Sequence, residues 1–122
     1  MFSLSTLTTP LFASALLLCA CTSQAASKVC PVLIDQSDQA NILDYMQRAN
    51  GGDACAQYNM GYQYYTQQDY SESERWYAKA AEQGVTRAAF DIAMLYRDKL
   101  LPGDDSERKR WHGKALRFTK QD

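Results

Sequence analysis

Charged side chains are absent from the first 27 residues of the chain, and the first of them is Lys28. Within this stretch, residues 11–21 form an apolar run that only Ser14 interrupts. The run is too short for a membrane-spanning helix, which needs roughly 20 residues, but it suits the core of a signal peptide. We therefore expect export of the chain, although the basic residue that usually precedes such a core is missing.

Histidine is scarce, since His112 is the only one in the chain. Neither sign of charge dominates, because the 13 Lys and Arg residues are nearly balanced by 14 Asp and Glu residues. A nearly neutral chain has no field that attracts nucleic acid, so no nucleic-acid partner is expected. The motifs G-x-S-x-G and H-E-x-x-H and the phosphate-binding loop are also missing, and no cofactor is expected. With 122 residues, 46% hydrophobic and 22% charged, the composition is that of one folded domain.

The end of the apolar run, L-C-A-C at residues 18–21, resembles a bacterial lipobox. This interpretation makes Cys21 the lipidated first residue of the mature protein, which its acyl chains would anchor in a membrane. Thr22 beside it, in place of Asp, implies the outer membrane by the same resemblance. Cleavage by signal peptidase after Ala25 satisfies the small-residue rule equally well. The expected location is the bacterial periplasm, as a soluble protein or an outer-membrane lipoprotein facing the periplasm, or the medium after secretion.

Four cysteines are present, but Cys19 leaves with the signal peptide, and Cys21 leaves with it or is acylated. The remaining pair, Cys30 and Cys55, would meet an oxidising compartment, which favours a disulfide. Such a bridge closes a loop of about 26 residues and stabilises the fold by about 3.5 kcal/mol. The alternative is two reduced thiols, with Cys55 packed as a small apolar residue. A metal site is not expected, because two cysteines and one histidine provide no ligand spacing.

Two stretches of the chain repeat themselves. A shift of 32 residues superimposes Gly52, Ala56, Tyr58, Met60, Gly61 and Tyr64 on Gly84, Ala88, Phe90, Ile92, Ala93 and Tyr96. A shift of 35 residues superimposes Asp69, Ser71, Glu72, Arg75, Trp76, Lys79 and Ala80 on Asp104, Ser106, Glu107, Arg110, Trp111, Lys114 and Ala115. The difference of three residues places an insertion in the loop 99–103, where Pro and Gly mark a break.

Helical start and stop signals fit this repeat. Capping-box spacing occurs at Ser71 and Glu74 and again at Asp104 and Glu107, and Gly84 stands where a C-terminal cap glycine belongs. We predict helices near residues 38–49, 53–66, 71–83, 85–98 and 105–119. Two helices per unit of this length are typical of an α-solenoid. The expected fold class is all-α, with two repeats of antiparallel helix pairs, about 52–83 and 84–119, after an N-terminal half-unit.

The first unit reads A-x-A-x-Y-N-M-G-x-x-Y at 54–64 and W-Y-x-K-A-A-E-Q-G at 76–84, with a fainter copy in the second unit. This pattern resembles the Sel-one-like repeat (SLR), a branch of the tetratricopeptide-like solenoids. The chain departs from it where Gln67-Gln68-Asp69 replaces a glycine-rich loop. The expected organisation is a signal peptide with a lipobox at 1–21, an N-terminal arm at 22–36 and a helical repeat domain at 37–122.

Several repeated residues have expected packing roles. Trp76 and Trp111 are expected to fill the space between helix pairs, and Gly61 to let neighbouring helices approach closely. Lys79 and Lys114 are expected on solvated helix flanks, with their stems over apolar surface.

A strip beside the packing face of the first helix in each unit is the candidate binding site. Two triplets with spacing i, i+4, i+7 match after the 32-residue shift: Tyr58, Tyr62 and Tyr65 with Phe90, Met94 and Arg97. In solenoids that this chain resembles, the strip lines the concave groove, and such side chains suit recognition of a peptide or of a helix of another protein. The alternative is that the ends of so short a solenoid fold over the strip as core.

Charge is uneven along the predicted helices. Residues 106–120 carry six Lys or Arg against one acid, Glu107, whereas residues 30–74 carry seven acids and a single base, Arg48. The basic end is either a polar capping helix or an electrostatic contact with an acidic partner or anionic lipid.

Three functions remain open. The resemblance implies, most generally, a non-catalytic protein–protein interaction module of the cell envelope. A periplasmic immunity or inhibitor protein against a toxin is the second. A β-lactam-interacting enzyme is the third, because cysteine-rich proteins of this family are associated with β-lactams and Ser106-x-x-Lys109 has the S-x-x-K spacing. Neither an S-D-N nor a K-T-G motif accompanies it, so catalysis is not favoured.

Overall fold

The computed structural model describes residues 27–120, so the predictions of a signal peptide and of lipidation at Cys21 concern residues outside this range. The described part contains five α-helices and no strand: α1 (Gln39–Asn50), α2 (Ala54–Thr66), α3 (Tyr70–Glu82), α4 (Thr86–Arg97) and α5 (Asp105–Thr119). All five predicted helices are present, and their ends lie within one residue of the expected positions.

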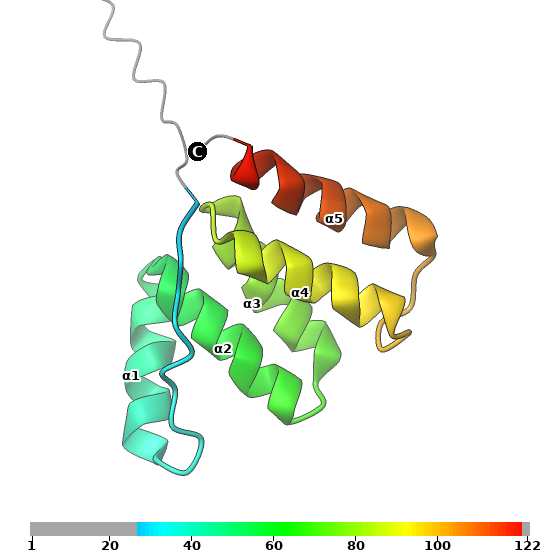
Figure 1. Cartoon of the computed structure of the whole chain (residues 1–122). Coiled ribbons are helices and arrows are strands. Elements are labelled where there is room, and N and C mark those ends of the chain that lie inside the picture. Colours follow the sequence, from blue (N-terminus) through cyan, green and yellow to red (C-terminus); the bar gives the residue numbers. More distant parts are fainter. Residues whose placement is uncertain (1–26, 121–122) are drawn as a thin grey trace, which may run out of the picture.

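Consecutive helices pack as antiparallel neighbours in a solenoid-like stack (Figure 1). Helix α2 pairs with α3, α4 pairs with α5, and the two pairs join where α3 meets α4. Helix α1 packs against α2 from the other end as a half-unit. The first helices of the two units, α2 and α4, therefore lie on one face of the stack, as the repeat predicts.

Aspartate side chains cap the N-terminal ends of four helices by accepting hydrogen bonds from backbone N–H groups. These N-cap residues are Asp38, Asp53, Asp69 and Asp104. The capping box predicted at Ser71 and Glu74 is wrong, because Asp69 caps α3 by accepting from the N–H of Glu72, and Ser71 lies inside the helix. Helix α4 has no side-chain cap, since Val85 stands at its start and is fully buried in the core.

Left-handed backbone ends the first four helices. Gly52 and Gly84 have φ of 95° and 91° after α1 and α3, which confirms the terminal role predicted for Gly84. Gln68 and Lys99 adopt φ of 64° and 56° after α2 and α4, where glycine would cost less. Between α2 and α3, a polar residue, Gln68, thus takes the left-handed conformation that favours glycine.

The predicted packing residues occupy equivalent places in both units. Trp76 and Trp111 are each 7% exposed. Lys79 Nζ lies 4.1 Å from the ring centroid of Trp76, and Lys114 Nζ lies 4.9 Å from that of Trp111. A lysine over a buried tryptophan is therefore a repeated feature, with the charge in solvent and the aromatic ring beneath it.

Gly61 allows close packing of α2 against α3. A Cβ atom at this position would lie 2.7 Å from Cε1 of Tyr77, which is closer than packed atoms tolerate. The same contact is fixed by Ser73, whose Oγ donates a hydrogen bond of 2.9 Å to the carbonyl oxygen of Gly61. Any larger residue at position 61 would separate the two helices of the first unit.

The segment 27–37, which we call the arm, runs extended along α2 (Figure 1). A disulfide joins Cys30 to Cys55, as predicted, with the Cα atoms 5.2 Å apart. Asn59, 1% exposed, holds the arm by its side-chain amide. Its Oδ1 accepts from the N–H groups of Leu33 and Ile34 at 2.8 and 3.1 Å, and its Nδ2 donates to the carbonyl of Pro31 at 3.1 Å. The arm thus covers a flank of α2.

Candidate partner-binding cleft

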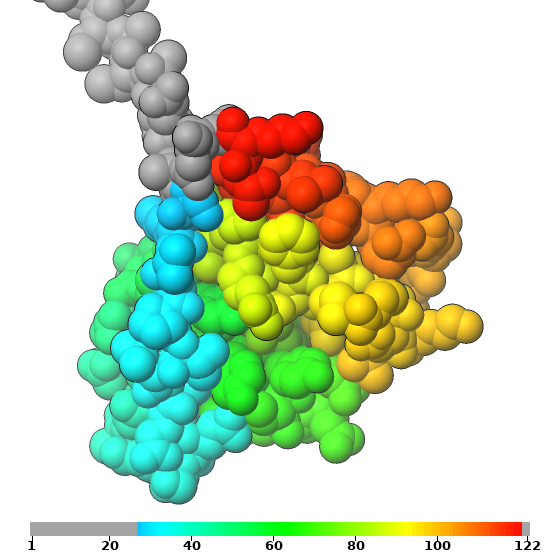
Figure 2. Space-filling model, in the orientation of Figure 1, coloured from blue at the N-terminus to red at the C-terminus, as the bar shows by residue number. Residues whose placement is uncertain are grey.

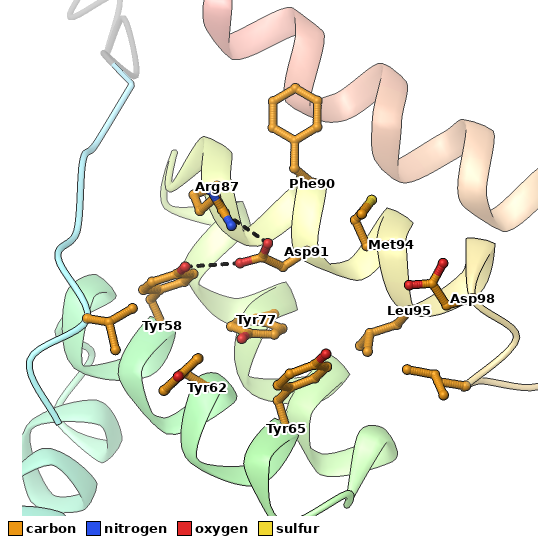
Figure 3. A pocket seen from close by; sticks show the side chains of 12 residues that line it. Tyr58, Tyr62, Tyr65, Tyr77, Arg87, Phe90, Asp91, Met94, Leu95 and Asp98 are labelled. Atoms are coloured by element: carbon orange, nitrogen blue, oxygen red, sulfur yellow. Dashed lines mark hydrogen bonds and ion pairs between the residues drawn. The ribbon is translucent and has the colours of Figure 1, made fainter. Parts of the chain in front are cut away.

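A cleft of about 500 Å³ opens between α2 and α4, with the arm along one side (Figure 2). Twelve residues line it: Val32 of the arm, Tyr58, Tyr62 and Tyr65 of α2, Tyr77 of α3, Arg87, Phe90, Asp91, Met94 and Leu95 of α4, and Asp98 and Leu100 of the following loop. The cleft therefore draws on both repeats, because each contributes its first helix to the same face (Figure 3).

The structure brings five of the six predicted strip residues to this cleft. The three tyrosines lie on the α2 wall, and Phe90 and Met94 lie on α4, with their side chains directed toward α5. Arg97 is not among the lining residues, and its guanidinium pairs with Asp98, with Nε 2.7 Å from Oδ1. The shift of 32 residues predicted its position on the helix, but the local ion pair sets the direction of its side chain.

The cleft has a buried floor and an exposed rim. Tyr58, Tyr77 and Leu95 form the floor and are 4%, 2% and 2% exposed. Tyr65 and Met94 form the rim on opposite walls, and each is 42% exposed. The predicted strip is thus partly core, as the alternative interpretation held, and partly open surface available to a partner.

A polar network crosses the floor from α2 to α4. Tyr58 Oη donates to Asp91 Oδ2 at 3.0 Å, and Arg87 Nε donates to the other carboxylate oxygen at 2.9 Å (Figure 3). Burial raises the pKa of the Asp91 carboxyl above its usual range, although the charge of Arg87 and both hydrogen bonds oppose this rise. Burial likewise raises the pKa of Tyr58, and the nearby Asp91 charge adds to the effect. Tyr58 therefore stays a hydrogen-bond donor to Asp91.

Sequence reasoning missed Asp91 and the residues around it. A signal existed, because the 32-residue shift that aligns the two units places Asp91 on Asn59. Both side chains accept hydrogen bonds from a segment that precedes their own helix in the chain. Asn59 accepts from the backbone of the arm, and Asp91 accepts from Tyr58 of α2. A polar residue at matched positions on the inner side of two helices indicates such a contact. Tyr77 was missed because it reaches the cleft from beneath, past Gly61.

A second hollow lies beside the first, where the arm meets the start of α4. It shares Val32, Tyr58, Arg87 and Phe90 with the larger cleft and adds Ser27 to Cys30 of the arm. Phe90 also packs against α5, with its ring centroid 5.6 Å from that of His112. The arm therefore shapes one wall of the binding face, and its position depends on the disulfide and on Asn59.

The chemistry that this face offers is binding through aromatic area, hydroxyl groups and a few charges. Among residues 27–120, no group of three or more His, Cys, Asp or Glu side chains is placed to hold a metal ion. No helix in that range is both long and apolar enough to cross a membrane. Tyrosine combines a large rigid surface with a hydrogen-bonding tip, which is the combination that recurs at the centres of protein interfaces.

Comparison of the chain with models of protein families, with curated proteins and with solved structures found no match.

Proposed function

We propose that the protein is a non-catalytic interaction module that binds a peptide or a helix of another protein in the cleft between α2 and α4. The observation that carries the proposal is the cleft itself, which has a tyrosine-rich floor and an open rim built from both repeats. A rim of Tyr65 and Met94 above a rigid floor provides apolar contact area at low entropic cost. The floor is held in shape by the hydrogen bond of Tyr58 to Asp91 before any partner arrives.

We further propose that the chain is a short, divergent member of the SLR family. Support comes from features that recur in both units: the buried tryptophans, the lysines above them and the small residues Gly61 and Ala93. In this family context, a groove on the face of the first helices is a site for another protein.

The proposed place of action is the bacterial envelope, with Cys21 as the point of lipid anchoring. The disulfide of Cys30 with Cys55 supports export, because such bridges persist in oxidising compartments. Labelling with radioactive palmitate tests the anchor. The wild-type protein should take up label, and Cys21→Ser should remove it and move the protein to the soluble periplasmic fraction. Unlabelled wild-type protein would refute the lipid anchor alone.

The binding proposal is tested by site-specific photocrosslinking in cells. A photoreactive phenylalanine analogue replaces Tyr65 at the rim of the cleft, and in a matched variant it replaces Arg75, which is 66% exposed on α3. We expect a discrete crosslinked product from position 65 and none from position 75. Mass spectrometry then identifies the partner peptide.

A second substitution makes this result specific. Met94→Ala shortens an exposed side chain on the α4 wall of the same cleft, so it should weaken the product formed at position 65 while leaving the melting temperature almost unchanged. Equal products from positions 65 and 75, or a product that is insensitive to Met94, would place the contact elsewhere and contradict the proposal.

A further inference from the structure

The last helix ends in an unbalanced positive charge. Residues 108–120 contain six Lys or Arg and no Asp or Glu. The cations at its start pair with acids of the same helix, as Arg110 does with Glu107. Lys114, Arg117 and Lys120 make no ion pair with an acid in the described part of the chain. Their charge is therefore not neutralised within this part of the protein.

The same end of the molecule receives the beginning of the arm. Helix α5 runs antiparallel to α4, with His112 beside Phe90, so its C-terminal end lies near the start of α4 (Figure 1). The arm begins at that point: Ser27 Oγ lies 2.7 Å from Thr86 Oγ1, and the N–H of Lys28 donates to the carbonyl of Gly84 at 2.9 Å. Lys28 thus adds a fourth cation to the basic end.

Two apolar side chains lie among these cations. Val29 is 89% exposed, which is unusual for its size, and Leu116 is 41% exposed. Cations mixed with exposed aliphatic side chains are typical of surfaces that lie at a membrane interface, where the cations meet head groups and the aliphatic groups enter below them. The acidic residues Asp35, Asp38 and Asp44 lie within or just before α1, which forms the opposite end of the stack (Figure 1).

We propose that this basic end, formed by Lys28, Lys114, Arg117 and Lys120 with Val29 and Leu116, rests on anionic phospholipid head groups. The inference relies on the proposed anchor for its orientation. Cys21 precedes Ser27 by six residues, which span at most roughly 20 Å when extended, so an acylated Cys21 would hold the basic end close to the lipid surface. The acidic end around α1 then points away from the membrane, since like charges repel.

A purely capping role does not account for this end. The 35-residue shift places His112 and Leu116 on Tyr77 and Ala81, which are 2% and 0% exposed within the first unit. The outer face of a last helix must be polar because no further unit covers it. Charges of both signs are enough to make this outer face polar, and the start of α5 carries such a mixture. The end of α5 carries positive charges only, which a capping role does not require.

Vesicle sedimentation tests the proposal. The chain from Thr22 onward, which lacks both the apolar signal segment and the cysteine that would be acylated, is mixed with vesicles of phosphatidylcholine containing phosphatidylglycerol and with vesicles of phosphatidylcholine alone. We expect binding only to the anionic vesicles, and weaker binding as salt is added. The double variant Arg117→Gln, Lys120→Gln should lower the partition coefficient roughly 25-fold, at about fivefold for each charge removed.

A matched control removes two cations from the far end of α4. Arg97→Gln with Lys99→Gln makes the same change in net charge and should leave the partition coefficient nearly unchanged. Equal losses from both pairs, or equal binding to neutral vesicles, would overturn the proposal. Retention on polyglutamate without binding to anionic vesicles would also overturn it, in favour of an acidic protein partner. None of these results affects the crosslinking experiment at Tyr65. The cleft proposal and the lipid proposal can therefore fail independently of each other.

Discussion

Tyr58 and Asp91 join the two repeats through one hydrogen bond of 3.0 Å, donated by a tyrosine that is only 4% exposed. The acceptor is a charged and partly buried carboxylate. Removing the tyrosine hydroxyl therefore leaves the Asp91 carboxylate with one hydrogen bond fewer to offset the cost of its burial. We expect Tyr58→Phe to lower the free energy of unfolding by about 1 to 2 kcal/mol, measured by urea denaturation. Tyr65→Phe is the control, since the Tyr65 ring is 42% exposed at the rim, and it should change stability little. Equal effects of the two variants would mean that the bond does not hold the repeats together.

Two glycines within helices should respond in opposite ways to alanine. At Gly61 a Cβ would meet the ring of Tyr77, so Gly61→Ala should destabilise the protein by about 1 to 3 kcal/mol. At Gly113 no atom lies within 4 Å of the added Cβ, so Gly113→Ala should stabilise α5 by about 0.5 to 1 kcal/mol. Thermal melts of both variants check the pair. A stable Gly61→Ala protein would show that Tyr77 can move without cost.

Reduction should affect the arm before the helices. Cys55→Ser should lower the free energy of unfolding by roughly 2 to 4 kcal/mol, because the bridge closes a long loop. Asn59 still holds the backbone at Leu33 and Ile34, so these amides should keep part of their protection in the reduced protein. Hydrogen exchange measures this directly. Adding Asn59→Ala should remove the remaining protection, and protection that survives both changes would contradict the role given to Asn59.

Acid should destabilise the protein between about pH 4 and pH 2. The N–H of Ala56, and then Arg48, hold the pKa of Asp53 below its usual range, and Arg108 with Lys109 lowers the pKa of Asp105 to about 2. An unfolded aspartate titrates near about 3.9, so the unfolded chain binds more protons in this window and stability falls with pH. Asp53→Asn keeps a capping side chain but does not titrate, so it should flatten the loss.

Asp91 should act in the opposite direction. Burial raises its pKa, so the folded chain binds the proton at a higher pH than the unfolded chain does, which adds stability as the pH falls. Asp91→Asn should therefore steepen the loss of stability on acidification, as measured by denaturation at a series of pH values. A flatter profile for this variant would show that Arg87 and Tyr58 outweigh the burial of the carboxylate.

Much of the fold could be predicted from the sequence because its determinants are local. The spacing of small and aromatic residues predicted the helix faces, Asp104 marked the start of α5, and Gly84 marked the end of α3. Matched tryptophans indicated the core of both units, and both are buried. The disulfide followed from an even number of cysteines in a chain for which the sequence predicts export. Each of these features can be predicted from residues that are close in sequence or from the number of residues of one type.

The shape of the cleft depends on how far apart residues of different helices lie, and the periodicity of the sequence does not give these distances. The repeat predicted that all six strip residues are equivalent, yet tertiary packing buried Tyr58 and left Tyr65 exposed at the rim. Arg97 instead forms a local ion pair with Asp98. The sequence by itself determined the repeat, the helices and the uneven charge. Only the tertiary structure decided that Asp91 meets Tyr58, that the arm walls the cleft, and that the basic end of α5 lies where the arm begins. The physical reason is that these contacts join residues from different helices, whose relative placement follows from the packing of whole side-chain surfaces.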